Sequence, residues 1–179
     1  MMTHQANYAY MAGQGFQAIA LPYRGGVSMV LMLPDAGQIK PFEDGLDDTK
    51  LQSIVDGLAN RLVLLTMPKF EYHSDSISLK RQLVALGMAD AFDPSAADFS
   101  GMDGQRDLFI GDGVHKAMVR VDEEGTEAAA ATAVQMQATS AMVDPPLSLT
   151  IDRPFVFLIR DDATGALLFM GRVVNPKIG

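Results

Sequence analysis

The run of small and polar residues from about Glu123 to about Asp144 constrains the fold most strongly, because it offers little to a hydrophobic core. No large apolar side chain occurs over 122–133. The run follows a segment, 114–121, in which apolar and polar residues alternate as in a half-buried strand. An alanine-rich surface helix capped by Thr126 fits the pattern. A long exposed loop also fits, and such loops inside compact domains are uncommon and usually functional.

The same small side chains suit insertion between two existing strands. Residues 128–131 are all alanine, and Thr132 follows them. These side chains fit a helical turn, and they also fit between strands without requiring a cavity. A large or charged side chain at an inward position would have to be buried, which is costly when it has no partner. The pattern therefore fits both a helix and an exposed loop for this run, and the run can adopt each of them at a different time.

Composition limits the classes of function. The chain has 179 residues, 48% of them hydrophobic and 20% charged, which suits one domain with its own core. The formal net charge is −8, and an acidic surface repels phosphate backbones and anionic lipids, so we expect no nucleic acid and no membrane as partners. The N-terminus has no basic segment followed by an apolar stretch, so no signal peptide is predicted. The absence of cysteine excludes disulfides and thiolate metal sites.

Strand-like segments dominate both ends of the chain. The segment 27–33 is apolar on both faces, as a buried central strand would be, and follows a turn predicted at Arg24-Gly25-Gly26. The C-terminal segments predict a buried hairpin with its turn at 161–165. The predicted strands are 16–21, 27–33, 61–67, 114–121, 155–159 and 166–174.

Two helices are predicted in the middle of the chain. The first is capped by Asp48 or Thr49 and carries apolar residues at helical spacing. The second is capped by Ser78 and ends at Gly87, which suits a left-handed C-cap. The apolar stripes are Leu51, Ile54, Val55 and Leu58 in the first helix, and Leu79, Leu83 and Leu86 in the second. The whole pattern predicts an α+β fold that is mostly β with a few helices.

The residues and spacings of common active sites are missing. The three histidines are His4, His73 and His115, and no Gly-x-Ser-x-Gly or His-Glu-x-x-His motif occurs. Gly13-Gln14-Gly15 lacks the third glycine of a dinucleotide loop, and the acidic residues 122–124 lack the spacing of a calcium loop. His73 with Asp75 would make only a weak metal site. We therefore expect no enzyme, no cofactor and no metal.

Several segments, in order along the whole chain, resemble landmarks of the serpin family. The run 123–132 resembles the hinge of inhibitory serpins position by position, and Val114-His115-Lys116-Ala117 resembles strand 5A, with His115 at the shutter position. The tail segments 151–159 and 165–176 resemble the family signature and the final strand. The upstream landmarks are Met67-Pro68-Lys69-Phe70, Leu86-Gly87-Met88 and Ala97-Asp98-Phe99-Ser100-Gly101.

The resemblance implies a serpin fold of which residues 1–179 are the C-terminal portion of a single domain, with an exposed reactive loop at about 123–144. Nothing in the chain resembles the N-terminal helices or strands 1A, 2A and 3A of the family. Loop insertion needs a strand on each side, and the segment 114–121 supplies only one. We therefore expect a fragment that does not inhibit alone, and a missing N-terminal serpin half as a further partner.

The resemblance also implies a function, that of a serine-type endopeptidase inhibitor acting as a suicide substrate. A target serine protease attacks the loop and forms an acyl-enzyme, and the hinge then inserts into sheet A. Counting from Gly125 places the reactive bond at Thr139–Ser140, with Met142–Val143 as the alternative. The small residue before the cut suits an elastase-like or subtilisin-like protease. The implied hinge consists of Glu123, Glu124, Gly125, Thr126, Glu127, Ala128, Ala129, Ala130, Ala131 and Thr132.

Other interpretations remain beside the inhibitor. A truncated or non-inhibitory serpin would act only as a binding or interaction module, although the alanines at 128–131 argue against a non-inhibitory hinge. An enzyme with an unrecognised site is the third alternative. His115 is expected to be a satisfied core histidine with a structural role. By family resemblance, the protein is expected to be extracellular or secreted.

Overall fold

The computed structural model describes residues 1–122 and 145–176, which form two compact units. Unit 1 contains Met1–Phe70 and the described residues from Val121 onward, and unit 2 contains Glu71–Arg120. The elements of unit 1 are β1 Met2–Gly13, β2 Phe16–Tyr23, β3 Val27–Pro34, α1 Ile39–Asp44, α2 Asp48–Asp56, β4 Ala59–Met67, β9 Leu147–Thr150, β10 Phe155–Asp161 and β11 Leu167–Val173. The remaining elements are β5 Phe70–His73, β6 Ile77–Ser78, α3 Lys80–Ala85, the 3-10 helix η1 Asp90–Phe92, α4 Ser100–Asp103, β7 Val114–His115 and β8 Met118–Val121.

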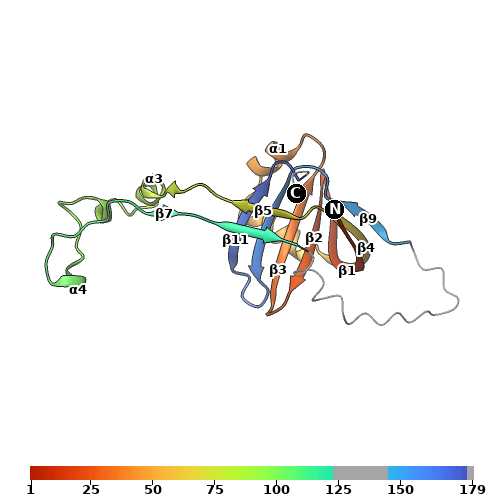
Figure 1. Cartoon of the computed structure of the whole chain (residues 1–179), viewed down its shortest axis with the longest axis horizontal. Coiled ribbons are helices and arrows are strands. Elements are labelled where there is room, and N and C mark those ends of the chain that lie inside the picture. The colour runs from red at the N-terminus through yellow and green to blue at the C-terminus, as the bar shows by residue number, and fades with distance from the viewer. Residues whose placement is uncertain (123–144, 177–179) are drawn as a thin grey trace. The chain divides into compact units, whose positions relative to one another are not determined.

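Unit 1 is built on a seven-stranded sheet with the order β11-β10-β3-β2-β1-β4-β9 (Figure 1). Neighbouring strands are antiparallel except β4 and β9, which run parallel. The predicted central strand 27–33 is confirmed, because β3 lies between β2 and β10 and Leu31 and Met32 are fully buried. The turn at Arg24-Gly25-Gly26 is confirmed too, with Gly25 and Gly26 at φ of +90° and +75°.

Helices α1 and α2 supply part of the core of unit 1. Phe42 of α1 and Ile54 of α2 pack in one cluster with the side chains of β2, β3 and β10. The predicted stripe of the first helix is confirmed in that Ile54 is buried, while the predicted cap is wrong. Asp47, rather than Asp48 or Thr49, accepts a hydrogen bond from the backbone N–H of Lys50, because Asp47 has the extended backbone of an N-cap while Asp48 and Thr49 lie inside the helix.

The long first strand, β1, was not predicted. It pairs with β2 on one side and with β4 on the other, with Ala9 opposite Ala20 and Thr3 opposite Thr66. Its more buried positions include His4 and Ala6 beside Tyr8 and Tyr10, so the apolar alternation that marks a strand is weak here. Pairing on both sides, which the sequence pattern does not reveal, decides the structure of this segment.

Unit 2 contains short elements and few buried side chains. The strand β6 pairs with β7, and β5 forms a separate two-stranded sheet with β8. The second predicted helix is confirmed as α3, and Gly87 adopts a φ of +101° after it. The predicted Ser78 cap is wrong, because the helix has no side-chain cap and the Ser78 hydroxyl instead donates to Asp112 at 2.8 Å.

The C-terminal hairpin is only half as predicted. Strands β10 and β11 pair with Phe157 opposite Gly171, which confirms the hairpin. Residues 155–158 of β10 are buried, whereas Leu167 to Met170 of β11 are exposed, so the prediction of a buried hairpin is wrong for β11. The reason is that β11 lies at the end of the sheet and pairs with β10 alone among the described strands.

Candidate functional site

The predicted reactive loop lies outside the described residues. This applies to the hinge from Glu123 to Thr132 and to the bonds Thr139–Ser140 and Met142–Val143. These assignments stay predictions. The structure does describe the strands before and after the loop, β8 and β9, and the contacts that hold each of them.

The segment that enters the loop is two short strands rather than the single strand predicted over 114–121. Strands β7 and β8 are separated by Lys116 and Ala117. Ser74 fills this gap, because its N–H donates to the Ala117 carbonyl at 2.8 Å and its hydroxyl accepts from the Ala117 N–H at 2.7 Å. A side-chain hydroxyl thus replaces a backbone partner, which interrupts the regular ladder. Ser74 is only 7% exposed, so both of its bonds are shielded from water.

His115, the predicted shutter residue, lies on β7 opposite Ile77. Its side chain is exposed, so the expectation of a core histidine is not met within unit 2. The physical reason is that β7 has only two residues and pairs with the equally short and exposed β6. A role for His115 in the loop's entry strand remains a prediction.

The segment that leaves the loop joins the edge of the large sheet. Strand β9 runs parallel to β4, with Leu149 opposite Leu65, and both side chains are 2% exposed. The N–H of Ile151 then donates to the Thr66 carbonyl at 2.8 Å, and the Ile151 side chain is fully buried. Two buried apolar residues at alternate positions, Leu149 and Ile151, and the backbone ladder therefore hold this segment to the sheet.

The signature segment 151–159 continues this anchor into the core. Arg153 donates from Nε to the Pro34 carbonyl at 2.8 Å, which ties the segment to the end of β3. The rings of Phe155 and Phe157 lie 5.7 and 6.0 Å from that of Phe70. A Cβ on Gly171 would lie 2.7 Å from the Phe157 ring, so the last strand needs glycine there. These residues support the fold and carry no reactive group.

His4, His73 and Asp161, a carboxyl group with a lowered pKa, each have a hydrogen-bond partner. His4 shares a hydrogen bond of 2.7 Å with the Tyr8 hydroxyl, and His73 shares one of 2.7 Å with Glu71 rather than with Asp75. Hydrogen bonds from the Thr164 hydroxyl and backbone N–H lower the pKa of Asp161 in the β10–β11 turn. Within residues 1–122 and 145–176, no group of three or more metal-binding side chains gathers.

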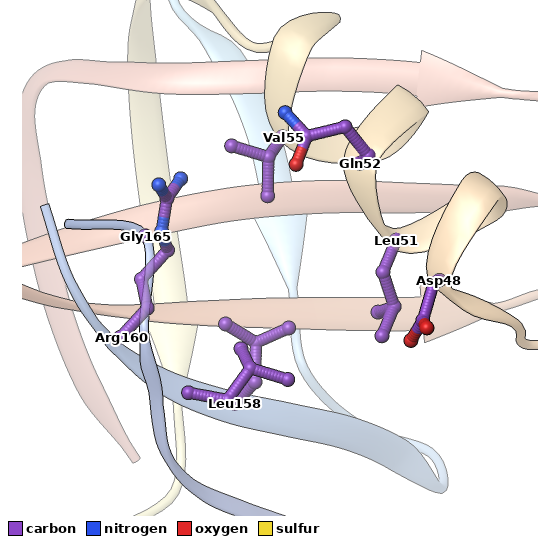
Figure 2. Close-up of a pocket in the computed structure, with 8 residues that line it drawn as sticks. Asp48, Leu51, Gln52, Val55, Leu158, Arg160 and Gly165 are labelled. Carbon is purple, nitrogen blue, oxygen red and sulfur yellow. The ribbon is translucent and has the colours of Figure 1, made fainter.

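A pocket of about 210 Å³ lies between α2 and the β10–β11 hairpin (Figure 2). Its walls are mixed polar and apolar, with one charge of each sign from Asp48 and Arg160. The remaining lining residues are Leu51, Gln52, Val55, Leu158, Gly165 and Leu167. No nucleophile paired with a base is among these lining residues. No helix among the described residues is long and apolar enough to span a membrane.

Comparison with known proteins identifies the family of the chain. The family model described as "Serpin (serine protease inhibitor)" matches residues 1–176. The chain belongs to the serpin family. It is 38% identical to a serpin-like protein of Thermococcus kodakarensis, over 100% of this chain and 42% of that protein. It is 41% identical to the leukocyte elastase inhibitor of Homo sapiens, over 94% of this chain and 46% of that protein. It is 36% identical to antithrombin-III of Ovis aries, over 99% of this chain and 39% of that protein.

The chain thus spans less than half the length of these relatives. Their family membership confirms the serpin resemblance and the α+β serpin class. Sequence patterns missed one residue that matters to the loop strand, Ser74, whose role depends on a partner 43 positions away. No local signal distinguishes this serine from a solvent-exposed one.

Proposed function

We propose that the protein in its complete form inhibits a serine-type endopeptidase as a suicide substrate. The supporting observation is that residues 123–144 connect two strands of different sheets, β8 and β9. Each strand has its own anchor, through Ser74 near β8 and Ile151 after β9. A segment held at both ends by separate sheets can be cleaved without loss of either anchor.

The first chemical step is acylation of the protease. The serine Oγ of the protease bonds to the carbonyl carbon of Thr139, the Thr139–Ser140 amide bond breaks, and the serine proton passes through the protease's base to the new amino group of Ser140. Cleavage frees the hinge 123–132 to insert beside the strand that precedes it. Small side chains in the hinge add no cavity and no unpaired charge to the sheet.

Insertion requires a strand on each side of the hinge. The segment containing β7 and β8 is one, and the part of the serpin domain that lies outside the match would provide the other. For the isolated chain, a non-inhibitory role as an interaction module is the second candidate, and the exposed apolar strand β11 favours it.

The proposal of an inhibitor includes an elastase-like or subtilisin-like target and an extracellular location. One relative is named an intracellular coagulation inhibitor.

The test uses the complete form, made by placing the part of the Thermococcus kodakarensis relative outside the match ahead of this chain. With a serine protease that cleaves the loop, we expect a complex that survives SDS. Thr126→Arg should convert the inhibitor into a substrate, because insertion would bury an unpaired charge, whereas Thr126→Ala should leave inhibition unchanged. An unchanged stoichiometry of inhibition in Thr126→Arg would contradict the proposal.

A further inference from the structure

The neighbour of the strand that enters the loop contains one extra residue. Ser74 is linked to Ala117, and Ile77 is paired with His115. Two residues, 75–76, lie between the first members of these pairs, whereas a single residue lies between the second members. Two residues opposite one define a β-bulge, and the extra residue here belongs to the segment that joins β5 to β6.

The loop-entry segment, residues 113–121, keeps a regular backbone opposite this bulge. The carbonyls of Gly113 and Ala117 accept hydrogen bonds from the N–H groups of Leu79 at 2.7 Å and of Ser74 at 2.8 Å. Both carbonyls therefore point toward the side of β5 and β6. The backbone groups of successive strand residues point alternately to the two edges, so residues at even separations point the same way. The alternation therefore continues across the gap between β7 and β8.

The other edge of the loop-entry segment carries the backbone groups of residues 114, 116 and 118. No described strand pairs with this edge, since the β5–β8 and β6–β7 sheets contain two strands each. In the proposed mechanism, the hinge pairs with this edge after cleavage. Such pairing needs donors and acceptors at the regular spacing of a strand, and a bulge within the segment would interrupt that spacing.

The hydroxyl of Ser74 allows the bulge to lie outside the loop-entry segment. In a regular antiparallel pair, Ser74 and Ala117 would exchange two backbone hydrogen bonds. The Ser74 N–H makes one of them, but the Ala117 N–H donates to the Ser74 hydroxyl at 2.7 Å instead of to the carbonyl. The chain after Ser74 can therefore turn away while the Ala117 N–H stays bonded. Ser74 is 7% exposed, so loss of the hydroxyl would leave this N–H unpaired where water has little access.

We propose that Ser74 is a positioning residue for insertion of the loop. Its hydroxyl accommodates the extra residue outside the loop-entry segment, so that the outer edge of this segment stays regular and can pair with the hinge. Without the hydroxyl, the Ala117 N–H reaches a partner only if the neighbouring segment shifts its register, and a shift of one residue turns side chains to the opposite face. The inference rests on the proposed function, because it concerns the step in which the hinge inserts.

The test uses the complete form, in which this chain follows the part of the Thermococcus kodakarensis relative outside the match. Cleavage of the loop should slow the exchange of the amide hydrogens of residues 114, 116 and 118 by about tenfold or more, because insertion pairs them. Ser74→Ala should remove most of this slowing. It should also raise the stoichiometry of inhibition by about fivefold or more, with the rate of loop cleavage unchanged.

Two further variants separate positioning from stability. Ser76→Ala changes an exposed serine within the bulge and should alter neither the exchange nor the stoichiometry. Deletion of Ser76 in the Ser74→Ala protein removes the extra residue, so the ladder becomes regular without the hydroxyl. We expect this deletion to restore both the slowing after cleavage and the low stoichiometry.

A measurement on this chain alone tests the hydrogen bond itself. Ser74→Ala should speed the exchange of the Ala117 amide hydrogen by about tenfold or more, and Ser76→Ala should not. No change at Ala117 would overturn the proposal, whatever the complete form does.

Three results with the complete form would also overturn it. The first is unchanged slowing after cleavage in Ser74→Ala, which would make Ser74 a structural link only, even if that variant were less stable. The second is a Ser76 deletion that restores nothing, and the third is no slowing in the unsubstituted protein. Trapping of the protease is measured separately. Slowing that depends on Ser74 without a covalent complex would contradict the proposed inhibition and support the role of Ser74.

Discussion

Units 1 and 2 differ in how much apolar surface they bury within themselves. Unit 1 has a continuous core in which Leu31 and Phe155 are fully buried. Among the apolar side chains of unit 2, only Phe92 and Ala97 are buried, while Leu86 is 81% exposed. Burial of apolar surface contributes roughly 25 cal/mol per Å², so unit 1 can be stable through its own contacts. Unit 2 has no comparable core of its own within the described residues.

The largest effect should come from the core of unit 1. Leu31→Ala removes a fully buried side chain from the middle of the sheet, and we expect it to lower the free energy of unfolding by about 2–5 kcal/mol. Leu86→Ala in unit 2 removes a side chain of the same size that is mostly exposed, and should change stability by about 0.5 kcal/mol or less. Urea unfolding of both variants measures the difference. Equal losses would contradict the contrast between the units.

A glycine in each unit provides the second comparison. Gly171→Ala would place a Cβ 2.7 Å from the Phe157 ring, and we expect a loss of about 1–3 kcal/mol. Gly101→Ala in α4 meets no atom within 4 Å and should be neutral or slightly stabilising. Thermal unfolding followed by circular dichroism tests the pair. A neutral Gly171→Ala would mean that the last strand is not packed against Phe157.

A helix from each unit provides the third comparison, because the helix of unit 1 has a side-chain cap and the helix of unit 2 has none. Asp47 caps α2 of unit 1 through the Lys50 N–H at 2.8 Å, whereas α3 of unit 2 has no side-chain cap. Asp47→Ala should cost about 1 kcal/mol, while Asp47→Asn should retain most of the cap. The measurement is the urea midpoint of each variant. If Asp47→Asn lost as much as Asp47→Ala, charge rather than capping would explain the effect.

The smallest expected effect is a change in the pH dependence of stability, through the carboxyl group of Asp161. Hydrogen bonds from Thr164 lower the pKa of Asp161 below its ordinary value of 3.8, so the charged form is favoured in the folded state. The resulting stabilisation is present above pH 3.8 and is lost as the pH falls through the lowered pKa. Thr164→Ala should therefore reduce stability at neutral pH more than at pH 2–3. A loss that does not change with pH would show that these hydrogen bonds do not favour the ionised carboxylate.

Much of unit 1 could be predicted because its strands carry their own patterns. The run 27–33 and the two glycines before it are sufficient to define β3 and its turn. Strand β1 was missed because its pattern is weak and its structure depends on pairing with β2 and β4. The exposure of β11 could not be predicted, because its apolar sequence is typical of a buried strand. The burial of a strand depends on its neighbours, which the sequence pattern does not specify.

In the candidate site too, features carried by consecutive residues could be predicted, whereas contacts between distant residues could not. The hinge stays a prediction that rests on resemblance over consecutive residues, 123–132, and the tail signature was predicted from Arg153 and Phe155 in their family order. The Ser74–Ala117 link could not be found in this way, because it joins residues that are far apart in the sequence. The predicted burial of His115 is wrong, because the residue lies on a two-residue strand whose partner is equally short and exposed.

The central claim is the proposed suicide-substrate mechanism, in which cleavage of the predicted loop leaves the protease covalently attached to the inhibitor. Intact-mass spectrometry of the complex between the complete form and a loop-cleaving serine protease tests it most directly. We predict a species with the mass of the protease joined by an ester to the chain ending at Thr139, or at Met142 for the alternative bond. The peptide that begins at Ser140, or at Val143, should appear as a separate mass. Complete cleavage of the loop with no covalent species at any time would contradict the account.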